Sequence, residues 1–127
     1  MRTDWENIIR ECKSLCYKSL NDATNKMLVE DDPIKYEYSK HLPKTKVYGE
    51  NGITCIIFNN KDSDAYKSYK EYFEKTHNGA NPYEEFHDWG QPNRKELLLW
   101  VITAETAMMY LNNIFGKDTV RVESFKM

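Results

Sequence analysis

A helix predicted over residues 93–115 constrains this chain more than any other feature, because its first part is apolar on every side. The run from Leu97 to Ile102 reads Leu-Leu-Leu-Trp-Val-Ile and covers more than one full helical turn. A helix at a protein surface keeps one polar side. We therefore expect either a central helix covered by the rest of the chain, or a helix with one face in a subunit contact.

Length and charge narrow the classes of protein further. The 127 residues allow one domain, over residues 1–127. A net charge of −2 argues against binding to duplex nucleic acid through a broad basic field. The longest apolar run is far shorter than the roughly 20 residues that span a bilayer, and no secretory signal pattern is present. We expect a cytoplasmic protein with no membrane partner.

Three further helices are predicted from apolar spacing and end signals. Residues 4–28 carry apolar side chains at helical intervals and predict a second long helix. Ser63 or Asp64 can cap a helix that ends at Asn78-Gly79. Asn81-Pro82 begins a predicted short helix over residues 82–88.

Strand patterns complete the fold prediction. Residues 34–39 alternate in polarity, and residues 45–48 and 53–58 flank an Asn-Gly turn that favours a hairpin. We expect the strand 53–58 to be central and residues 119–125 to form a closing strand. The order predicts an α+β fold: a small, mostly antiparallel sheet of three to four strands covered by two long helices and one or two shorter ones.

The main candidate site is the connection over residues 77–94. It holds two of the three histidines, two of the four prolines and one of the three tryptophans, in a connection longer than chain closure needs. Arg94 falls in the first turn of the helix 93–115, where the helix dipole favours an anion. The residues that we expect to bind a ligand are Tyr83, Phe86, His87, Trp89, Asn93 and Arg94.

Two interpretations of this set stay open. The aromatic rings can stack on a planar group while Asn93 contacts its polar edge, which suits a phosphate-bearing or nucleotide-like ligand. In the other interpretation, Phe86 and Trp89 pack into the core and Arg94 pairs with a nearby carboxylate.

The sequence indicates no metal and no cofactor. Glu84-x-x-His87 occurs once, whereas carboxylate-bridged di-iron sites need this spacing twice. Cys12-x-x-x-Cys16 has no second ligand pair for zinc. No glycine-rich phosphate-binding motif is present.

A cysteine nucleophile is also disfavoured. Cys55 together with His77 or His87 and Asp88 supplies the residue types of such a site. However, Cys55 lies within a predicted buried strand, where a thiol stays protonated and unreactive.

These observations favour a non-catalytic binding protein: an inhibitor, adaptor or ligand-sequestering module, such as a phage or mobile-element accessory protein. Its partner would be a host protein or a small anionic ligand, and it could form a homo-oligomer through the helix region 97–109. The alternative is a small cytoplasmic enzyme that acts on a phosphate-bearing substrate with His87 as acid or base. Single-stranded nucleic acid ranks last, through exposed tyrosines and Lys35, Lys40, Lys44 and Lys46.

Overall fold

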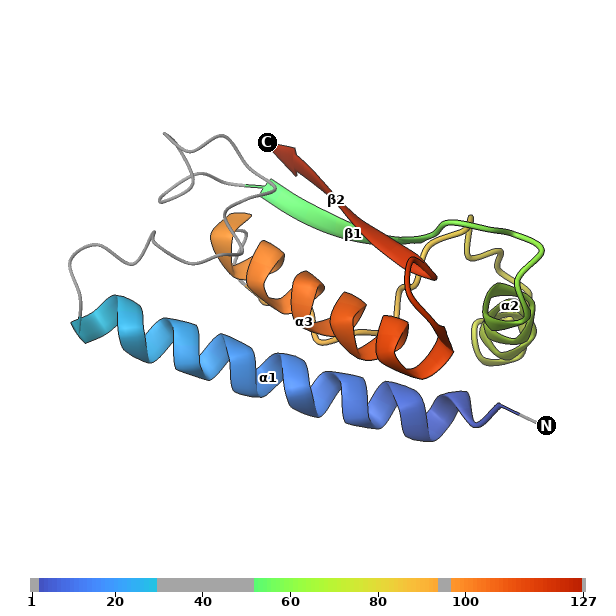
Figure 1. Ribbon diagram of the computed structural model, residues 1–127, viewed down its shortest axis with the longest axis horizontal. Coiled ribbons are helices and arrows are strands. Elements are labelled where there is room, and N and C mark those ends of the chain that lie inside the picture. Colours follow the sequence, from blue (N-terminus) through green and yellow to red (C-terminus); the bar gives the residue numbers. More distant parts are fainter. Residues whose placement is uncertain (1–2, 30–51, 94–96, 127) are drawn as a thin grey trace.

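The computed structural model describes residues 3–29, 52–93 and 97–126, which form an α+β fold of three helices and a two-stranded antiparallel sheet. Along the chain the elements are α1 (Trp5–Val29), β1 (Gly52–Phe58), α2 (Asp64–Thr76), α3 (Leu97–Phe115) and β2 (Val120–Lys126). Figure 1 shows three layers, with α3 between the sheet and α1, while α2 stands at one end.

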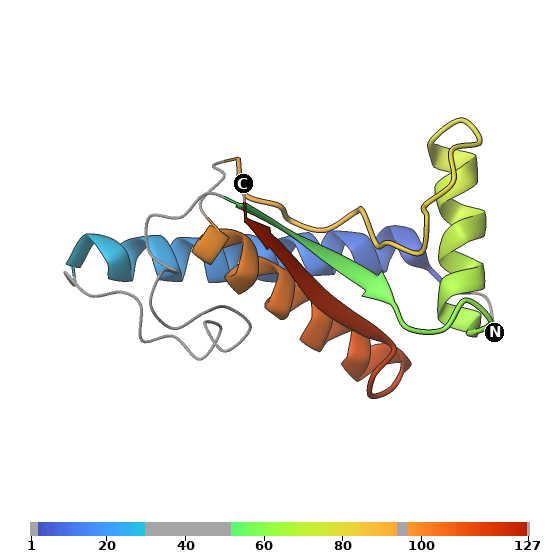
Figure 2. The ribbon, with the colours of Figure 1, turned by 90° about the horizontal axis from the view of Figure 1, so that it is seen from above.

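The apolar helix α3 is the central layer of the fold. α1 lies along one side of it and both strands lie on the other, as Figures 1 and 2 show. Ten of its 19 residues are buried, so the apolar run is covered within a single copy of the chain. The central-helix interpretation is confirmed, and a subunit contact through residues 97–109 stays a prediction.

α3 also bears on the predicted absence of a membrane partner. Among the described residues, α3 is a helix long and apolar enough to span a membrane by length and composition alone. However, 56% of the span-length window is buried inside the fold, as in the core helix of a soluble protein. The absence of a membrane partner and the cytoplasmic location therefore stay predictions.

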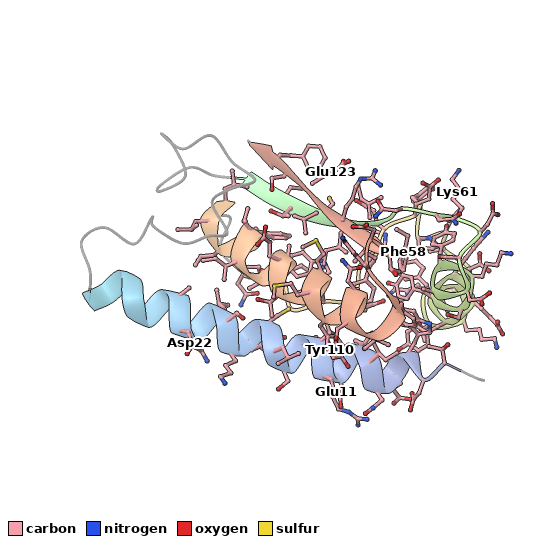
Figure 3. All side chains as sticks on the ribbon, viewed as in Figure 1. Glu11, Asp22, Phe58, Lys61, Tyr110 and Glu123 are labelled. Carbon is pink, nitrogen blue, oxygen red and sulfur yellow. The ribbon has the colours of Figure 1, made fainter. Side chains whose placement is uncertain are left out.

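α1 contacts α3 through buried thiols and through hydrogen bonds between the layers. Cys12 and Cys16 are both fully buried, and the Cys16 thiol donates to the Thr103 carbonyl at 3.3 Å. A hydrogen bond to Cys16 and then burial raise the pKa of Cys12, so this thiol stays neutral. Nearer the end of α3, the Tyr110 hydroxyl donates to the Glu11 carboxylate across the two layers (Figure 3).

The sheet joins two segments that lie far apart in the sequence. β1 and β2 pair antiparallel from Gly52↔Lys126 to Phe58↔Val120, so the predicted closing strand is confirmed. Alternate residues of β1 are buried against α3, as a strand with one covered face requires. The other two predicted strands, at 34–39 and 45–48, lie outside the described residues.

The predicted short helix at 82–88 is wrong. Tyr83 and Glu84 have φ values of 51° and 66°, which lie in the left-handed region and cannot continue a right-handed helix. The Asn81 side-chain oxygen instead accepts a hydrogen bond from the Tyr83 N–H at 3.0 Å. This Asx turn replaces the expected helix cap.

The same segment pairs with β1 instead. The Phe58 N–H donates to the Glu84 carbonyl at 2.8 Å, and the Phe86 N–H donates to the Ile56 carbonyl at 2.8 Å. These two bonds flank an isolated antiparallel bridge between Ile57 and Glu85. At its Phe58 end β1 therefore has a backbone partner on both edges, and its central position in a sheet of three to four strands stays a prediction.

Candidate functional site

The segment 77–93 is fixed at both ends by close backbone contacts. At its start, Gly79 has a φ of 83° and its N–H donates to the Glu74 carbonyl at 2.8 Å, which ends α2. Near its end, Gly90 lies against α1, where an added Cβ would come within 2.8 Å of the Cys16 Cβ. The connection is therefore anchored to two helices and to β1.

The two large aromatic residues expected to stack on a ligand are buried. Phe86 is 1% exposed and its ring lies 5.0 Å from Tyr69 and 5.9 Å from Trp5. Trp89 is 2% exposed and packs edge-on against Trp100. These rings offer no open face, so the arrangement fits the interpretation in which both pack into the core.

His87 holds the turn that precedes it. Because a carbonyl oxygen only accepts, the His87 Nε2 donates to the Pro82 carbonyl, at 2.8 Å. The same nitrogen lies 3.6 Å from a Glu85 carboxylate oxygen, and the ring packs beside Phe73. The His87 Nε2, which lies near the Glu85 carboxylate, therefore already donates its hydrogen to the backbone. Asn93 is exposed, and the remaining predicted residue, Arg94, lies outside the described residues.

Asp88 ties the segment to α2 through a small polar network. The Tyr69 hydroxyl donates to Asp88 Oδ2 at 2.5 Å and accepts the His87 N–H at 3.0 Å. Burial and then the Asp88 carboxylate raise the pKa of Tyr69, so the hydroxyl stays neutral. The other carboxylate oxygen lies 3.6 Å from Nε2 of His77, whose ring stacks on Phe73. These contacts position the segment and leave no free acid–base pair among the groups named.

A small cavity beside β1 brings three of the predicted site residues together. Its volume is about 160 Å³, and Phe86, His87 and Trp89 line it with Cys55 and Gln91. Drug-sized ligands occupy roughly 300 Å³ or more. The cavity is therefore too small for a nucleotide.

Cys55, at the wall of this cavity, is poorly suited to be a nucleophile. Burial, and then hydrogen bonding and charge from Glu85, raise its pKa to about 12. Glu123, directly across the strand pair, adds to the effect. Because the thiolate is the reactive form, this thiol stays inert at neutral pH. Within the described part of the chain, no group of three His, Cys, Asp or Glu side chains could hold a metal ion.

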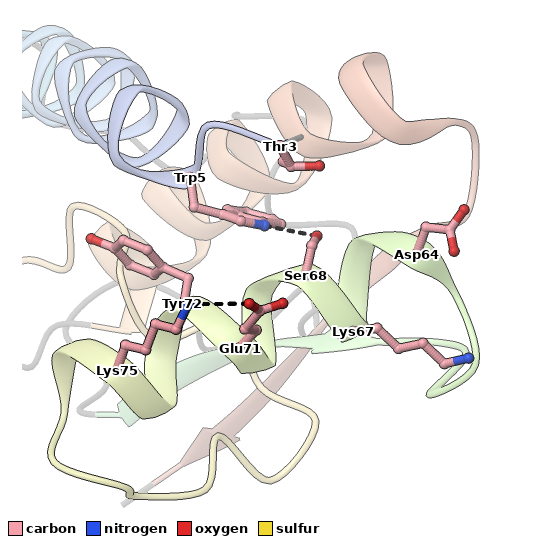
Figure 4. A pocket seen from close by; sticks show the side chains of 8 residues that line it. All are labelled: Thr3, Trp5, Asp64, Lys67, Ser68, Glu71, Tyr72 and Lys75. Carbon is pink, nitrogen blue, oxygen red and sulfur yellow. Dashed lines mark hydrogen bonds and ion pairs between the residues drawn. The ribbon is translucent and has the colours of Figure 1, made fainter. Parts of the chain in front are cut away.

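A larger open cavity of about 480 Å³ lies between the start of α1 and α2 (Figure 4). The Trp5 indole N–H donates to the Ser68 hydroxyl at 2.9 Å across its floor. Its charges balance, with two lysines and two carboxylates, and Lys75 pairs with Glu71 at 3.2 Å. The lining residues are Thr3, Trp5, Asp64, Lys67, Ser68, Glu71, Tyr72 and Lys75. This cavity therefore has no preference for an anion.

A third cavity, of about 380 Å³, lies between α2 and the left-handed turn at Tyr83. Three lysines and only one carboxylate line it, so its charge is positive. The Tyr83 side chain is 77% exposed at its rim. The lining residues are Lys61, Tyr66, Lys67, Lys70, Asn81, Tyr83 and Glu84. We call this space the lysine cavity.

The sequence prediction missed the lysines of this cavity. Lys67 and Lys70 are three residues apart on a helix that was predicted correctly, so their shared face could have been recognised. Their proximity to Tyr83 could not, because it depends on the left-handed turn that replaces the predicted helix at 82–88. Of the five predicted ligand-binding residues that the structure describes, Tyr83 alone lines the lysine cavity.

Comparison with models of protein families, with curated proteins and with solved structures finds nothing that matches this chain.

Proposed function

We propose that this chain is a non-catalytic binding protein that sequesters a small phosphate-bearing ligand in the lysine cavity. The observation that carries the proposal is the combination of three lysines with one exposed aromatic ring around a space of about 380 Å³. A space of this size is enough for a nucleotide-like molecule.

The charge balance of the cavity supports an anionic ligand. Lys61 pairs with Glu84 at 2.6 Å, and this hydrogen bond and charge raise the lysine pKa, so Lys61 stays cationic. Lys67 and Lys70 add two further positive charges to the wall. The Lys70 Nζ lies 4.0 Å from a Glu74 carboxylate oxygen, at the limit of an ion pair. A phosphate group has several negatively charged oxygens, so it can accept hydrogen bonds from two of these lysines at once.

Tyr83 supports a planar group attached to that phosphate. Its side chain is exposed although tyrosine usually buries much of its ring. Its backbone is held by the Asn81 turn and by the pairing of Glu84 with β1, so the ring stands on a fixed support. An exposed aromatic ring on an ordered backbone can stack on a base at a lower entropic cost than one on a flexible loop.

The ionisable groups near the lysine cavity already have hydrogen-bond partners, which favours binding of a ligand over its chemical conversion. His87 lines the small cavity instead of the lysine cavity, and its Nε2 is bonded to Pro82. Asp88 is bonded to Tyr69, so neither residue is free to move a proton at a ligand beside Lys67 and Lys70. Sequestration of a ligand from a host, or presentation of it to a host protein, would fit such a site.

The test is titration of the full chain with AMP and with inorganic pyrophosphate, followed by calorimetry and by ³¹P NMR. We expect AMP to bind with a dissociation constant below about 1 mM and to remain chemically unchanged. Lys67→Glu with Lys70→Glu should weaken binding at least about tenfold, because two charge-assisted contacts are lost. Lys75→Glu is the matched control, because it reverses a charge on the same helix outside the cavity.

Three outcomes would contradict the proposal. The first is a lack of binding by both probes, and the second is equal weakening by Lys75→Glu and by the paired substitution. The third is conversion of the probe in the ³¹P spectrum that His87→Ala abolishes, which would support the enzyme alternative.

A further inference from the structure

The lysine cavity has two ends of different chemistry. Figure 2 shows that the chain turns where α2 ends and returns beside the helix, in the opposite direction, toward β1. Where this returning segment reaches β1, the Glu84 carbonyl accepts the Phe58 N–H at 2.8 Å, and only residues 59–63 separate β1 from the start of α2. Glu84 therefore lies toward the start of α2, whereas Lys70, in the middle of the helix, lies toward the other end of the cavity.

Charge distinguishes these two ends. At the end near the start of α2, the Lys61 Nζ lies 2.6 Å from Glu84 Oε1, so the carboxylate balances the charge of this lysine. At the other end, Lys67 and Lys70 are three residues apart and share one side of α2. A phosphate group is attracted by these two lysines and repelled by the Glu84 carboxylate. A phosphate-bearing ligand is therefore oriented, with its uncharged part beside the Lys61–Glu84 pair.

The Lys61–Glu84 pair has the groups that recognise a hydroxyl. A hydroxyl both donates and accepts hydrogen bonds. When Glu84 Oε1 contacts Lys61, the second carboxylate oxygen, Oε2, remains an acceptor, and the lysine ammonium has three N–H donors. Both side chains are partly exposed, so a ligand in the cavity can reach them. The contact between them also holds the two charged groups in place.

We propose that the Lys61–Glu84 pair binds ribose hydroxyls and makes the lysine cavity selective for ribonucleotides over deoxyribonucleotides, an inference that rests on the proposed binding of a phosphate-bearing ligand. The phosphate lies beside Lys67 and Lys70, and the base stacks on Tyr83 at the rim. In a nucleotide the ribose joins these two parts, and Glu84 directly follows Tyr83 in the chain. A carboxylate that accepts from a ribose hydroxyl is also how many dinucleotide-binding folds recognise ribose.

An amino group on the base is the other donor that a carboxylate could bind. Two observations favour the ribose. The Glu84 side chain is 37% exposed and Tyr83 is 77% exposed, so the part of a ligand beside Glu84 lies deeper than the base at the rim. An aromatic amino group also offers no acceptor to the Lys61 ammonium, whereas a hydroxyl bonds to both members of the pair.

The test is calorimetric titration of the full chain with AMP, with deoxy-AMP and with purine riboside monophosphate. Deoxy-AMP lacks one ribose hydroxyl, and purine riboside monophosphate lacks the amino group of the base. We expect deoxy-AMP to bind about tenfold more weakly than AMP, because a hydrogen bond to a charged partner is lost. Purine riboside monophosphate should bind as AMP does. These titrations use the wild type, so they depend on no variant that could misfold.

A matched pair of variants assigns the preference to Glu84. Glu84→Met keeps the length of the side chain and removes both oxygens, so AMP and deoxy-AMP should bind within about twofold of each other. The ratio of the two affinities is the measure, because loss of a carboxylate also strengthens phosphate binding. Glu71→Met removes a carboxylate from α2 outside the lysine cavity and should keep the preference of about tenfold.

The outcomes separate this inference from the proposed function. Equal binding of AMP and deoxy-AMP, or a preference that persists in Glu84→Met, would overturn the ribose assignment while the cavity still binds a phosphate. Weak binding of purine riboside monophosphate alone would assign Glu84 to the base and would also overturn it. Binding of pyrophosphate without AMP would overturn this inference only, and binding of neither would overturn both.

Discussion

The two sides of the segment 77–93 serve different purposes. On the inward side, Phe86 and Trp89 are buried, and His87 and Asp88 are bonded to neighbouring groups. On the outward side, Tyr83 is exposed at the rim of the lysine cavity. The inward residues fix the path of the chain, and the path in turn fixes the position of the outward ring.

This difference explains how an irregular connection can hold a site in place. A segment without helical or strand hydrogen bonds has high conformational entropy unless other contacts order it. Here the order comes from buried rings and from a few hydrogen bonds to Tyr69, Pro82 and β1. The stability of the fold and the affinity for a ligand should therefore respond to different substitutions.

Trp89→Ala should have the largest effect on stability. The side chain is buried and packs edge-on against Trp100 at 5.7 Å between ring centroids. Truncation of a buried aromatic residue costs about 3 to 5 kcal/mol, a large part of the stability of a small domain. Urea unfolding followed by circular dichroism measures it. The control is Tyr83→Leu on the outward side, and equal losses in both variants would contradict the distinction.

Gly90→Ala should be the next most damaging. The added Cβ would lie 2.8 Å from the Cys16 Cβ and 3.3 Å from the Lys13 carbonyl, so α1 or the segment must shift. Such overpacking costs about 1 to 3 kcal/mol. The same unfolding experiment tests it. An unchanged midpoint would show that the segment does not press against α1 at this point.

The regular elements were predictable because their signals are periodic. Apolar residues at helical intervals located α1, and the continuous apolar run located α3 together with its central place. The sequence predicted β2 as a strand but did not predict that it pairs with β1, because no local pattern specifies which distant segment lies beside a given strand. The register from Gly52↔Lys126 onward is a property of the assembled core.

The candidate site was less predictable, for a physical reason. Asn81-Pro82 is a good helix start by composition, yet the Asn81 side chain bonds to Tyr83 and forms a turn. Pairing of Glu84 and Phe86 with β1 then stabilises the turn over the helix. Since two local conformations compete closely, tertiary hydrogen bonds decide between them. The position of Tyr83 relative to the lysines of α2 follows from the turn that these bonds stabilise.

Tyr69→Phe should have a moderate effect, because it joins the inward side to α2. The hydroxyl is bonded to the Asp88 carboxylate and to the His87 N–H, and both lose a partner in the variant. Loss of such bonds costs about 1 kcal/mol or slightly more. Urea unfolding at neutral pH measures the loss, and a more stable variant would contradict the assigned role.

The same residue predicts a dependence on alkaline pH. Burial and the Asp88 contact raise the pKa of Tyr69 above its ordinary value of 10.0, so the folded state retains a proton that the unfolded state releases. This contribution to the free energy of unfolding is complete below that value and is lost as the pH rises above it, by up to roughly 1.4 kcal/mol per pH unit. Unfolding curves between about pH 8 and about pH 11 should therefore converge for the wild type and Tyr69→Phe.

Tyr83→Gly should have the smallest effect on stability and a clear effect on binding. A left-handed backbone costs a residue with a side chain about 1 kcal/mol relative to glycine, and the greater freedom of unfolded glycine offsets much of this. Because the ring is exposed, its loss removes few contacts, so we expect a change within about 1 kcal/mol in either direction. AMP affinity should nevertheless fall, whereas Tyr83→Phe should retain it because the stacking face remains. A loss of stability as large as that of Trp89→Ala would mean that the Tyr83 ring orders the segment, and the outward side would then belong to the scaffold instead of to the site.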